Sequence, residues 1–204
     1  MSIYFNINDK FKDTLIIYYD SRINTTKEDY YENYVVFRDE KFNVKSVNVL
    51  NYPEAKEYSH FGLLNYKTDE NIKKDLLKLN SNYHFNDDLN YFRIGKIIKR
   101  EAHPKSEKLF VLQVDFKDEV KQIITNTLYT LENKYFVWCM PGSITSKGLE
   151  IKDGEVMGVK SLGMLCSSES LDLNEKKTNE FAEFLNKCND NFLGKNIFEV
   201  LNWK

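Results

Sequence analysis

Leu109-Phe110-Val111-Leu112-Gln113-Val114-Asp115 is a run whose β-branched and aromatic residues predict a β-strand. Similar runs precede and follow it, and they predict strands at Phe92–Lys99, Val120–Thr125, Tyr135–Met140 and Met164–Cys166. Glycine-containing turns such as Pro141-Gly142 separate the later runs. Five short strands joined in this way are typical of a small closed barrel such as the OB-fold. We therefore expect an all-β, five-stranded barrel over residues 91–173.

The residues before the barrel predict a separate, small α+β domain over 1–88. Its strand-like runs, rich in β-branched and aromatic residues, lie at 15–19, 34–37 and 42–50. Thr68, which precedes Asp69 and Glu70, is a typical helix start. The polar residues 20–33 are expected to form a long loop, and the turn formers at 80–88 a linker.

The residues after the barrel predict a tail that returns against it. Phe181, Phe184 and Leu185 have the spacing of one helix face. We assign this segment, 174–200, to the second domain, which is then expected to cover residues 90–200 in all.

Composition and charge exclude several classes of protein. The 204 residues carry 29 basic and 31 acidic side chains, a net charge of -2, so the chain does not bind by bulk positive charge as a histone does. It has no run of eighteen apolar residues and no secretory signal, which predicts a cytoplasmic protein without a membrane partner. Its three cysteines form no CxxC pair, which argues against a disulfide scaffold or a zinc ribbon. We expect no cofactor and no metal.

Several ordered motifs in the barrel region carry a family resemblance. They are Ile94-Gly95-Lys96-Ile97, Glu101–Leu109, Met140-Pro141-Gly142 and Gly158-Val159-Lys160-Ser161-Leu162-Gly163-Met164-Leu165-Cys166-Ser167. In order and spacing they resemble the tRNA-binding domain that is appended to aminoacyl-tRNA synthetases. This domain occurs in bacterial phenylalanyl-tRNA synthetase β chains, in many methionyl-tRNA synthetases and in free-standing proteins of the YtpR type, whose layout the whole chain also resembles. The resemblance implies an OB-fold that binds tRNA and has no catalytic site.

The same resemblance, together with side-chain chemistry, predicts an RNA-binding surface. The candidates are His103, Lys105, Lys108, Lys147, Lys152, Lys160, Ser161, Met164 and Ser167. Lysine places a point charge near a phosphate, serine can bond a phosphate or ribose, and methionine can pack on a base. Two alternatives stay open: Met164 belongs to the core, or His103 serves only the turn that Pro104 imposes.

Departures from the family pattern leave two functions to weigh. Where the family commonly has Cys-Gly-Ala-Pro-Asn-Val, this chain has residues Thr125 to Thr130, and Met157 replaces a basic residue. The first hypothesis is a non-catalytic protein that binds tRNA or another structured RNA, with a synthetase or other translation protein as a further partner. The alternative is a protein-interaction or chaperone-like OB module with weakened RNA affinity. An enzyme is not expected, and a homodimer is left open.

Overall fold

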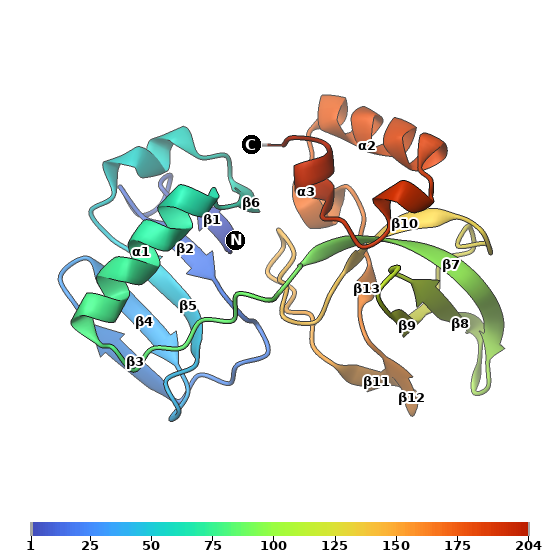
Figure 1. Ribbon diagram of the computed structural model, residues 1–204, viewed down its shortest axis with the longest axis horizontal. Coiled ribbons are helices and arrows are strands. Elements are labelled where there is room, and N and C mark those ends of the chain that lie inside the picture. Colours follow the sequence, from blue (N-terminus) through green and yellow to red (C-terminus); the bar gives the residue numbers. More distant parts are fainter. Residues whose placement is uncertain (1, 204) are drawn as a thin grey trace. The chain divides into compact units, whose positions relative to one another are not determined.

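The computed structural model describes residues 2–203 and contains two compact units (Figure 1). The first unit consists of residues 2–89 and 142–150, and the second of residues 90–141 and 151–203. The protein is mostly β with few helices, and every strand pairing within its sheets is antiparallel. None of the helices in the described part of the chain has the length and apolar character needed to cross a membrane.

A six-stranded sheet forms the body of the first unit. Its order is β3-β4-β5-β2-β1-β6. The strands are β1 (Ile3–Asn6), β2 (Leu15–Tyr18), β3 (Lys27–Tyr30), β4 (Tyr34–Arg38), β5 (Val44–Val49) and β6 (Phe61–Leu63), with a short 3-10 helix, η1 (Pro53–Glu57), before β6. The three predicted strands correspond to β2, β4 and β5. The predicted loop at 20–33 is wrong in part, because it contains the edge strand β3, whose Lys-Glu-Asp-Tyr sequence lacks apolar alternation.

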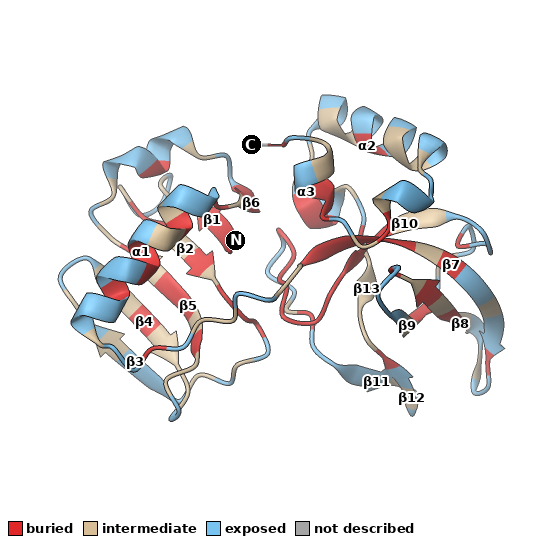
Figure 2. Ribbon diagram, in the orientation of Figure 1, coloured by how far each residue is buried: buried red, intermediate tan, exposed pale blue. Residues whose placement is uncertain are grey.

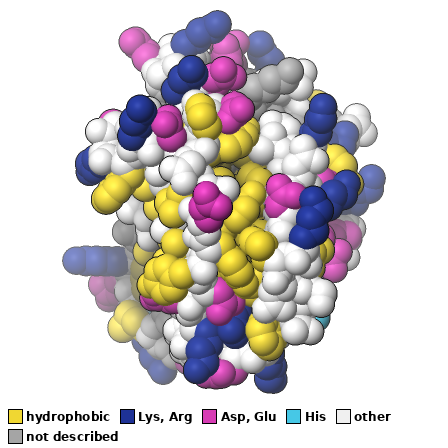
Figure 3. Space-filling model, turned by 90° about the vertical axis from the view of Figure 1, so that its left-hand side faces the viewer, with side chains coloured by type: hydrophobic (Ala, Val, Ile, Leu, Met, Phe, Trp, Pro, Cys, Tyr) yellow, Lys and Arg dark blue, Asp and Glu magenta, His cyan; other side chains and the backbone are white. Residues whose placement is uncertain are grey.

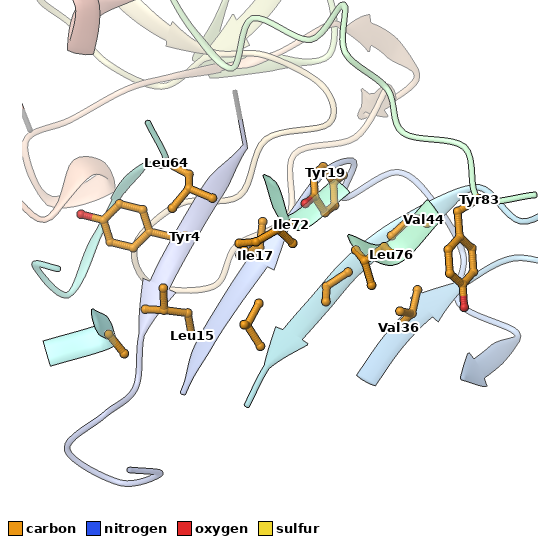
Figure 4. Packing of buried hydrophobic residues seen from close by; sticks show 13 residues of the cluster. Tyr4, Leu15, Ile17, Tyr19, Val36, Val44, Leu64, Ile72, Leu76 and Tyr83 are labelled. Carbon is orange, nitrogen blue, oxygen red and sulfur yellow. The ribbon is translucent and has the colours of Figure 1, made fainter. Parts of the chain in front are cut away.

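One face of this sheet is covered by α1 (Tyr66–Leu79). The side chain of Asn65 caps the helix by accepting a 2.9 Å hydrogen bond from the backbone N–H of Thr68, so the helix begins slightly before the predicted start. Ile72 and Leu76 of α1 pack on Leu15, Ile17 and the other strand residues shown in Figure 4. These contacts form the hydrophobic core of the first unit.

The second unit contains a five-stranded sheet in the order β13-β10-β7-β8-β9. The strands are β7 (Phe92–His103), β8 (Ser106–Asp115), β9 (Val120–Thr125), β10 (Tyr135–Cys139) and β13 (Met164–Leu165). All five predicted runs are therefore strands. A separate hairpin of β11 (Gly154–Val156) and β12 (Val159–Ser161) precedes β13.

The two edges of this sheet approach each other just after β12. The backbone N–H of Leu162 donates a 2.8 Å hydrogen bond to the carbonyl of Gln122 in β9. The Gln122 side chain in turn donates to the carbonyl of Lys160 at 2.7 Å. These bonds bring the segment leading into β13, one edge strand, against β9, the other edge strand.

Many residues of this sheet are buried, as the red parts of its strands in Figure 2 show. Trp138, Phe116 and Leu112 are fully buried. A Cβ atom added to Gly95 would lie 2.6 Å from a methyl of Val114 and 2.7 Å from the ring of Phe116, so these side chains can pack against β7 here only because Gly95 has no side chain. The tail adds the predicted helix as α2 (Glu175–Lys187), together with η2 (Glu169–Leu171), η3 (Asp190–Phe192) and α3 (Ile197–Val200).

Residues 142–150 leave the second unit and pack in the first. The backbone N–H of Ser21 donates to the carbonyl of Gly142 at 2.9 Å, and its hydroxyl donates to the carbonyl of Ser143 at 2.6 Å. Lys45 of β5 forms a 2.5 Å ion pair with Glu150. This segment lies inside the range that the sequence predicts for the second domain, because a local pattern gives no sign that its partners are more than a hundred residues away.

Candidate nucleic-acid interface

Two hairpin tips meet in the second unit, and His103 joins them. His103 ends β7, and its Nδ1 atom accepts a 3.1 Å hydrogen bond from the backbone N–H of Lys105. The ring is therefore the tautomer that donates from Nε2, and it does so to the carbonyl of Val156 in β11 at 3.1 Å. Its exposed fraction is 4%. Both ring nitrogens are thus bonded within the protein, and this placement favours the structural alternative for His103.

Lys105 lies in the same turn as His103, between β7 and β8, and faces the tip of the β11–β12 hairpin. A Cβ atom at Gly158 would be 2.9 Å from the Lys105 Nζ atom, and Gly158 also has a φ of +80°. Glycine is favoured at this position by its backbone conformation, whereas the flexible end of the Lys105 side chain could move aside. Two sequence-distant turns are combined into one exposed edge that carries a positive charge.

Three predicted lysines of this region keep exposed, uncompensated charges. Lys105, Lys108 and Lys160 are exposed, and among residues 2–203 no ion pair is found for any of them. By contrast, Lys99 is paired with Glu101 at 3.0 Å. Glu155 is the cross-strand neighbour of Lys160 and partly offsets its field. The region can therefore attract phosphate, though with a modest positive potential.

Ser161 has a structural position. It is 8% exposed, and its hydroxyl accepts a 3.0 Å hydrogen bond from the backbone N–H of Ile124 in β9. The same hydroxyl donates to the carbonyl of Gly163 at 3.2 Å. Both bonds hold the segment after β12 against the sheet edge, so the Ser161 hydroxyl is occupied by the backbone.

Met164 and Ser167 line a groove of about 380 Å³ next to this edge. Its other walls are the start of β8, the end of β9, the loop that follows β9, and Val156. Met164 is half-buried, so part of its side chain is accessible in the groove. Ser167 is exposed and shares a 3.1 Å hydrogen bond with the Ser170 hydroxyl. The groove thus offers an apolar wall and a hydroxyl close together, which suits a base with its ribose.

The other two predicted lysines are less closely associated with the groove. Lys152 is exposed in the segment before β11. Lys147 is exposed too, but it lies in the 142–150 segment of the first unit. Figure 3 views the molecule from the side on which the first unit is drawn, and this face mixes basic and acidic side chains around a band of hydrophobic ones. Positive charge is not concentrated on that face.

Sequence reasoning missed the loop between β9 and β10 as part of the groove. Leu128 and Tyr129 are 75% and 63% exposed, and Tyr129 lines the groove together with Asn126 and Thr127. The available signal was the departure from the family pattern at residues 125–130.

Tyr135, Lys96 and Asp190 form a polar cluster next to this loop. The Tyr135 hydroxyl donates to Asp190 at 2.5 Å, and Lys96 forms a 3.2 Å ion pair with the same carboxylate. The hydrogen bond from Tyr135, followed by that from Lys96, lowers the pKa of Asp190 below its usual value. The negative charge of Asp190 is therefore stabilised by Tyr135 and Lys96.

Comparisons with known proteins find their matches in the same region of the chain that contains the groove. Residues 92–188 match the family model described as "Putative tRNA binding domain". The phenylalanine–tRNA ligase beta subunit of Clostridium acetobutylicum is 38% identical over 109 residues, which are 52% of this chain and 13% of that protein. The corresponding subunit of Thermotoga maritima is 41% identical over 82 residues, 40% of this chain and 10% of that protein.

A free-standing relative matches over the same region. The protein named "Putative tRNA-binding protein YtpR" of Bacillus subtilis is 37% identical over 82 residues, which are 40% of this chain and 41% of that protein. The chain thus spans less than half the length of each of these curated relatives. Residues 92–188 of this chain, which contain the groove and the three exposed lysines, are therefore similar to a tRNA-binding domain.

Proposed function

We propose that this protein is a non-catalytic tRNA-binding protein that uses one surface of an OB-fold barrel. The observation that carries the proposal is the groove lined by Met164 and Ser167, with the exposed Lys105, Lys108 and Lys160 on neighbouring strands and turns. The names of the curated relatives support tRNA as the ligand, because they refer to tRNA ligases and to a tRNA-binding protein.

The sheet of the second unit supports the OB-fold part of the proposal. Strands β7, β8 and β9 form a meander, β10 returns beside β7, and β13 lies outside β10. The hydrogen bonds of Gln122 with Leu162 and Lys160 connect the free edge of β9 to the segment before β13. A five-stranded sheet that closes in this order is the OB arrangement, which binds nucleic acid on an open strand face and its loops.

The proposed division of labour follows from the side chains. The lysine ammonium groups neutralise phosphates without reading sequence, and the groove packs a base or sugar. Because the lysines supply few charges and Glu155 opposes one of them, we propose weak binding that depends strongly on salt. A synthetase or another translation protein in the cytoplasm is the proposed further partner.

The test is a titration of the full chain with unfractionated tRNA at several salt concentrations. We expect the logarithm of the affinity to fall linearly with the logarithm of the salt concentration, by roughly 0.7 to 0.9 units for each phosphate contact. An otherwise identical titration with an uncharged polymer serves as the control. Absence of binding at the lowest salt concentration would refute the proposal.

A second candidate function is favoured by the exposed apolar side chains of the second unit. Leu128, Leu131 and Met157 are 75%, 51% and 54% exposed. Such residues are typical of a surface that binds protein. If tRNA does not bind, a protein-interaction or chaperone-like role for the barrel is the better explanation, and the same lysines are then ordinary solubilising residues.

A further inference from the structure

Tyr129 lies between two grooves of the second unit. The first is the groove of Met164 and Ser167. The second, of about 500 Å³, lies between α2 and the chain leading into β10, and its walls include Lys134, Tyr135 and Asn186. Tyr129 lines both grooves. Tyr129 therefore lies where the two grooves adjoin.

The loop that carries Tyr129 is held in place although the ring is open to solvent. The Thr130 hydroxyl donates to the carbonyl of Thr127 at 2.6 Å, and Thr130 is fully buried. The Tyr129 ring also contacts Phe136, with ring centroids 5.9 Å apart. A tyrosine that is fixed on its backbone and 63% exposed loses little conformational entropy when a ligand stacks on it.

The second groove places a positive charge close to the exposed Tyr129 ring. Lys134 is exposed, and no ion pair is found for it within residues 2–203. The nearby acidic groups are engaged: Asp190 binds Tyr135 and Lys96, and Glu132 accepts a 2.9 Å hydrogen bond from the backbone N–H of Arg100. An exposed aromatic ring beside an available ammonium group is the arrangement that holds an unpaired nucleotide, by stacking on its base and contacting its phosphate.

We propose that Tyr129 is a base-stacking residue and that the site takes RNA with at least one unpaired nucleotide, whose strand runs from the Met164 groove across Tyr129 to Lys134. This inference rests on the proposed RNA-binding function and adds the class of RNA. A continuous duplex keeps its bases stacked inside, so it can use the lysines but cannot use Tyr129.

The test compares two fluorescent RNAs with the same number of phosphates, one fully paired and one with a short unpaired 3′ extension. Binding of the full chain is followed by fluorescence anisotropy. Tyr129→Ala is expected to weaken binding of the extended RNA roughly five- to 150-fold, the range for loss of one stacked base. Binding of the paired RNA and the salt dependence should not change, because stacking releases no counterion.

Two further variants serve as matched controls. Tyr129→Phe keeps the ring and should bind both RNAs like the wild type. Tyr66→Ala removes a tyrosine of similar exposure, 67%, from α1 of the first unit and should also leave both affinities unchanged. An extended RNA with 2-aminopurine in the unpaired segment gives a direct signal, since its fluorescence should fall on binding to the wild type but not to Tyr129→Ala.

The outcomes separate this inference from the function on which it rests. If Tyr129→Ala binds the extended RNA like the wild type while Lys108→Ala weakens both RNAs, the stacking role is wrong and RNA binding stands. Equal weakening of both RNAs by Tyr129→Ala likewise overturns the preference for unpaired nucleotides. If the wild type binds neither RNA, both proposals fail, and a protein ligand for the apolar loop becomes the explanation.

Discussion

Replacing Lys108 and Lys160 together by alanine removes two positive charges from two different strands of the candidate interface. Lys108 belongs to β8 and Lys160 to β12, and both are exposed without an ion pair among the residues that the structure describes. Their charges are therefore not already balanced within the protein. If each of them contacts one phosphate, the double variant loses two released counterions.

The size of the effect follows from this count. Two phosphate contacts contribute about 1.4 to 1.8 units to the slope of log affinity against log salt. The affinities of the wild type and the double variant should differ most at low salt. A fourfold rise in salt concentration should reduce the ratio of the two affinities about seven- to twelvefold. A filter-binding titration with bulk tRNA and with one purified tRNA measures both quantities. The loss should be the same for both RNAs, because lysine reads no sequence.

The matched control removes two lysines elsewhere and changes the net charge equally. Lys12 and Lys78 lie in the first unit, where they pair with Asp13 at 4.0 Å and Asp75 at 2.8 Å. Lys12→Ala with Lys78→Ala should leave the salt slope unchanged. Equal slopes for the wild type and the Lys108/Lys160 variant would refute the assignment of these lysines to the interface, and equal losses in both double variants would show a nonspecific effect of net charge.

Three other changes test single residues. Met164→Ala should weaken tRNA binding without changing the salt slope, and because Met164 is only half-buried its cost in stability should stay below the about 2–5 kcal/mol of a fully buried methionine; a melting curve beside the titration separates the two effects. His103→Ala removes the bond to Val156 and should lower the free energy of unfolding by about 1–2 kcal/mol in a urea titration, whereas a loss of affinity in a fully folded variant would show that the ring does reach RNA. In the first unit, two hydrogen bonds from Arg38, at 2.6 and 3.0 Å, lower the pKa of Asp29 below 3.8, so its contribution to stability is complete above pH 3.8 and is lost as the pH falls through the lowered value. Asp29→Asn should therefore cost about 1–3 kcal/mol at neutral pH and progressively less in acid, and a cost that is independent of pH would contradict this explanation.

The strands of the second unit could be predicted because their signal is local. Each of the runs from Phe92 to Leu165 alternates or concentrates apolar residues over a few positions, and burial on one side of a sheet requires this pattern. The edge strand β3 could not be found in the same way. Its residues Lys27–Tyr30 are mostly polar and solvent-facing, so their strand geometry comes from pairing with β4 and not from their own sequence.

The residue types of the candidate interface were predictable from the sequence, but the contacts that their side chains make were not. The sequence indicates that residues 103–108 and 160–167 act together, and the structure places many of them around one edge of the sheet. The sequence cannot indicate that Ser161 binds the backbone of Ile124, or that His103 binds that of Val156, because each contact depends on a strand formed elsewhere. Tyr129 was missed because an aromatic residue is ordinarily expected to be buried. In the structure its neighbour Thr130 is buried instead, and Tyr129 is exposed.

The exchange of residues 142–150 into the first unit has a consequence for biosynthesis. A nascent chain that has only just passed Leu89 lacks Gly142 and Ser143, whose carbonyls accept the hydrogen bonds of Ser21. By the time the ribosome has added Glu150, strands β7 to β10 have also been made. Domains usually fold in the order in which they emerge. Here the unit that emerges first can form its sheet and core from its own residues, but it gains the bonds of Ser21 and the ion pair of Lys45 only after the middle of the second unit has been made.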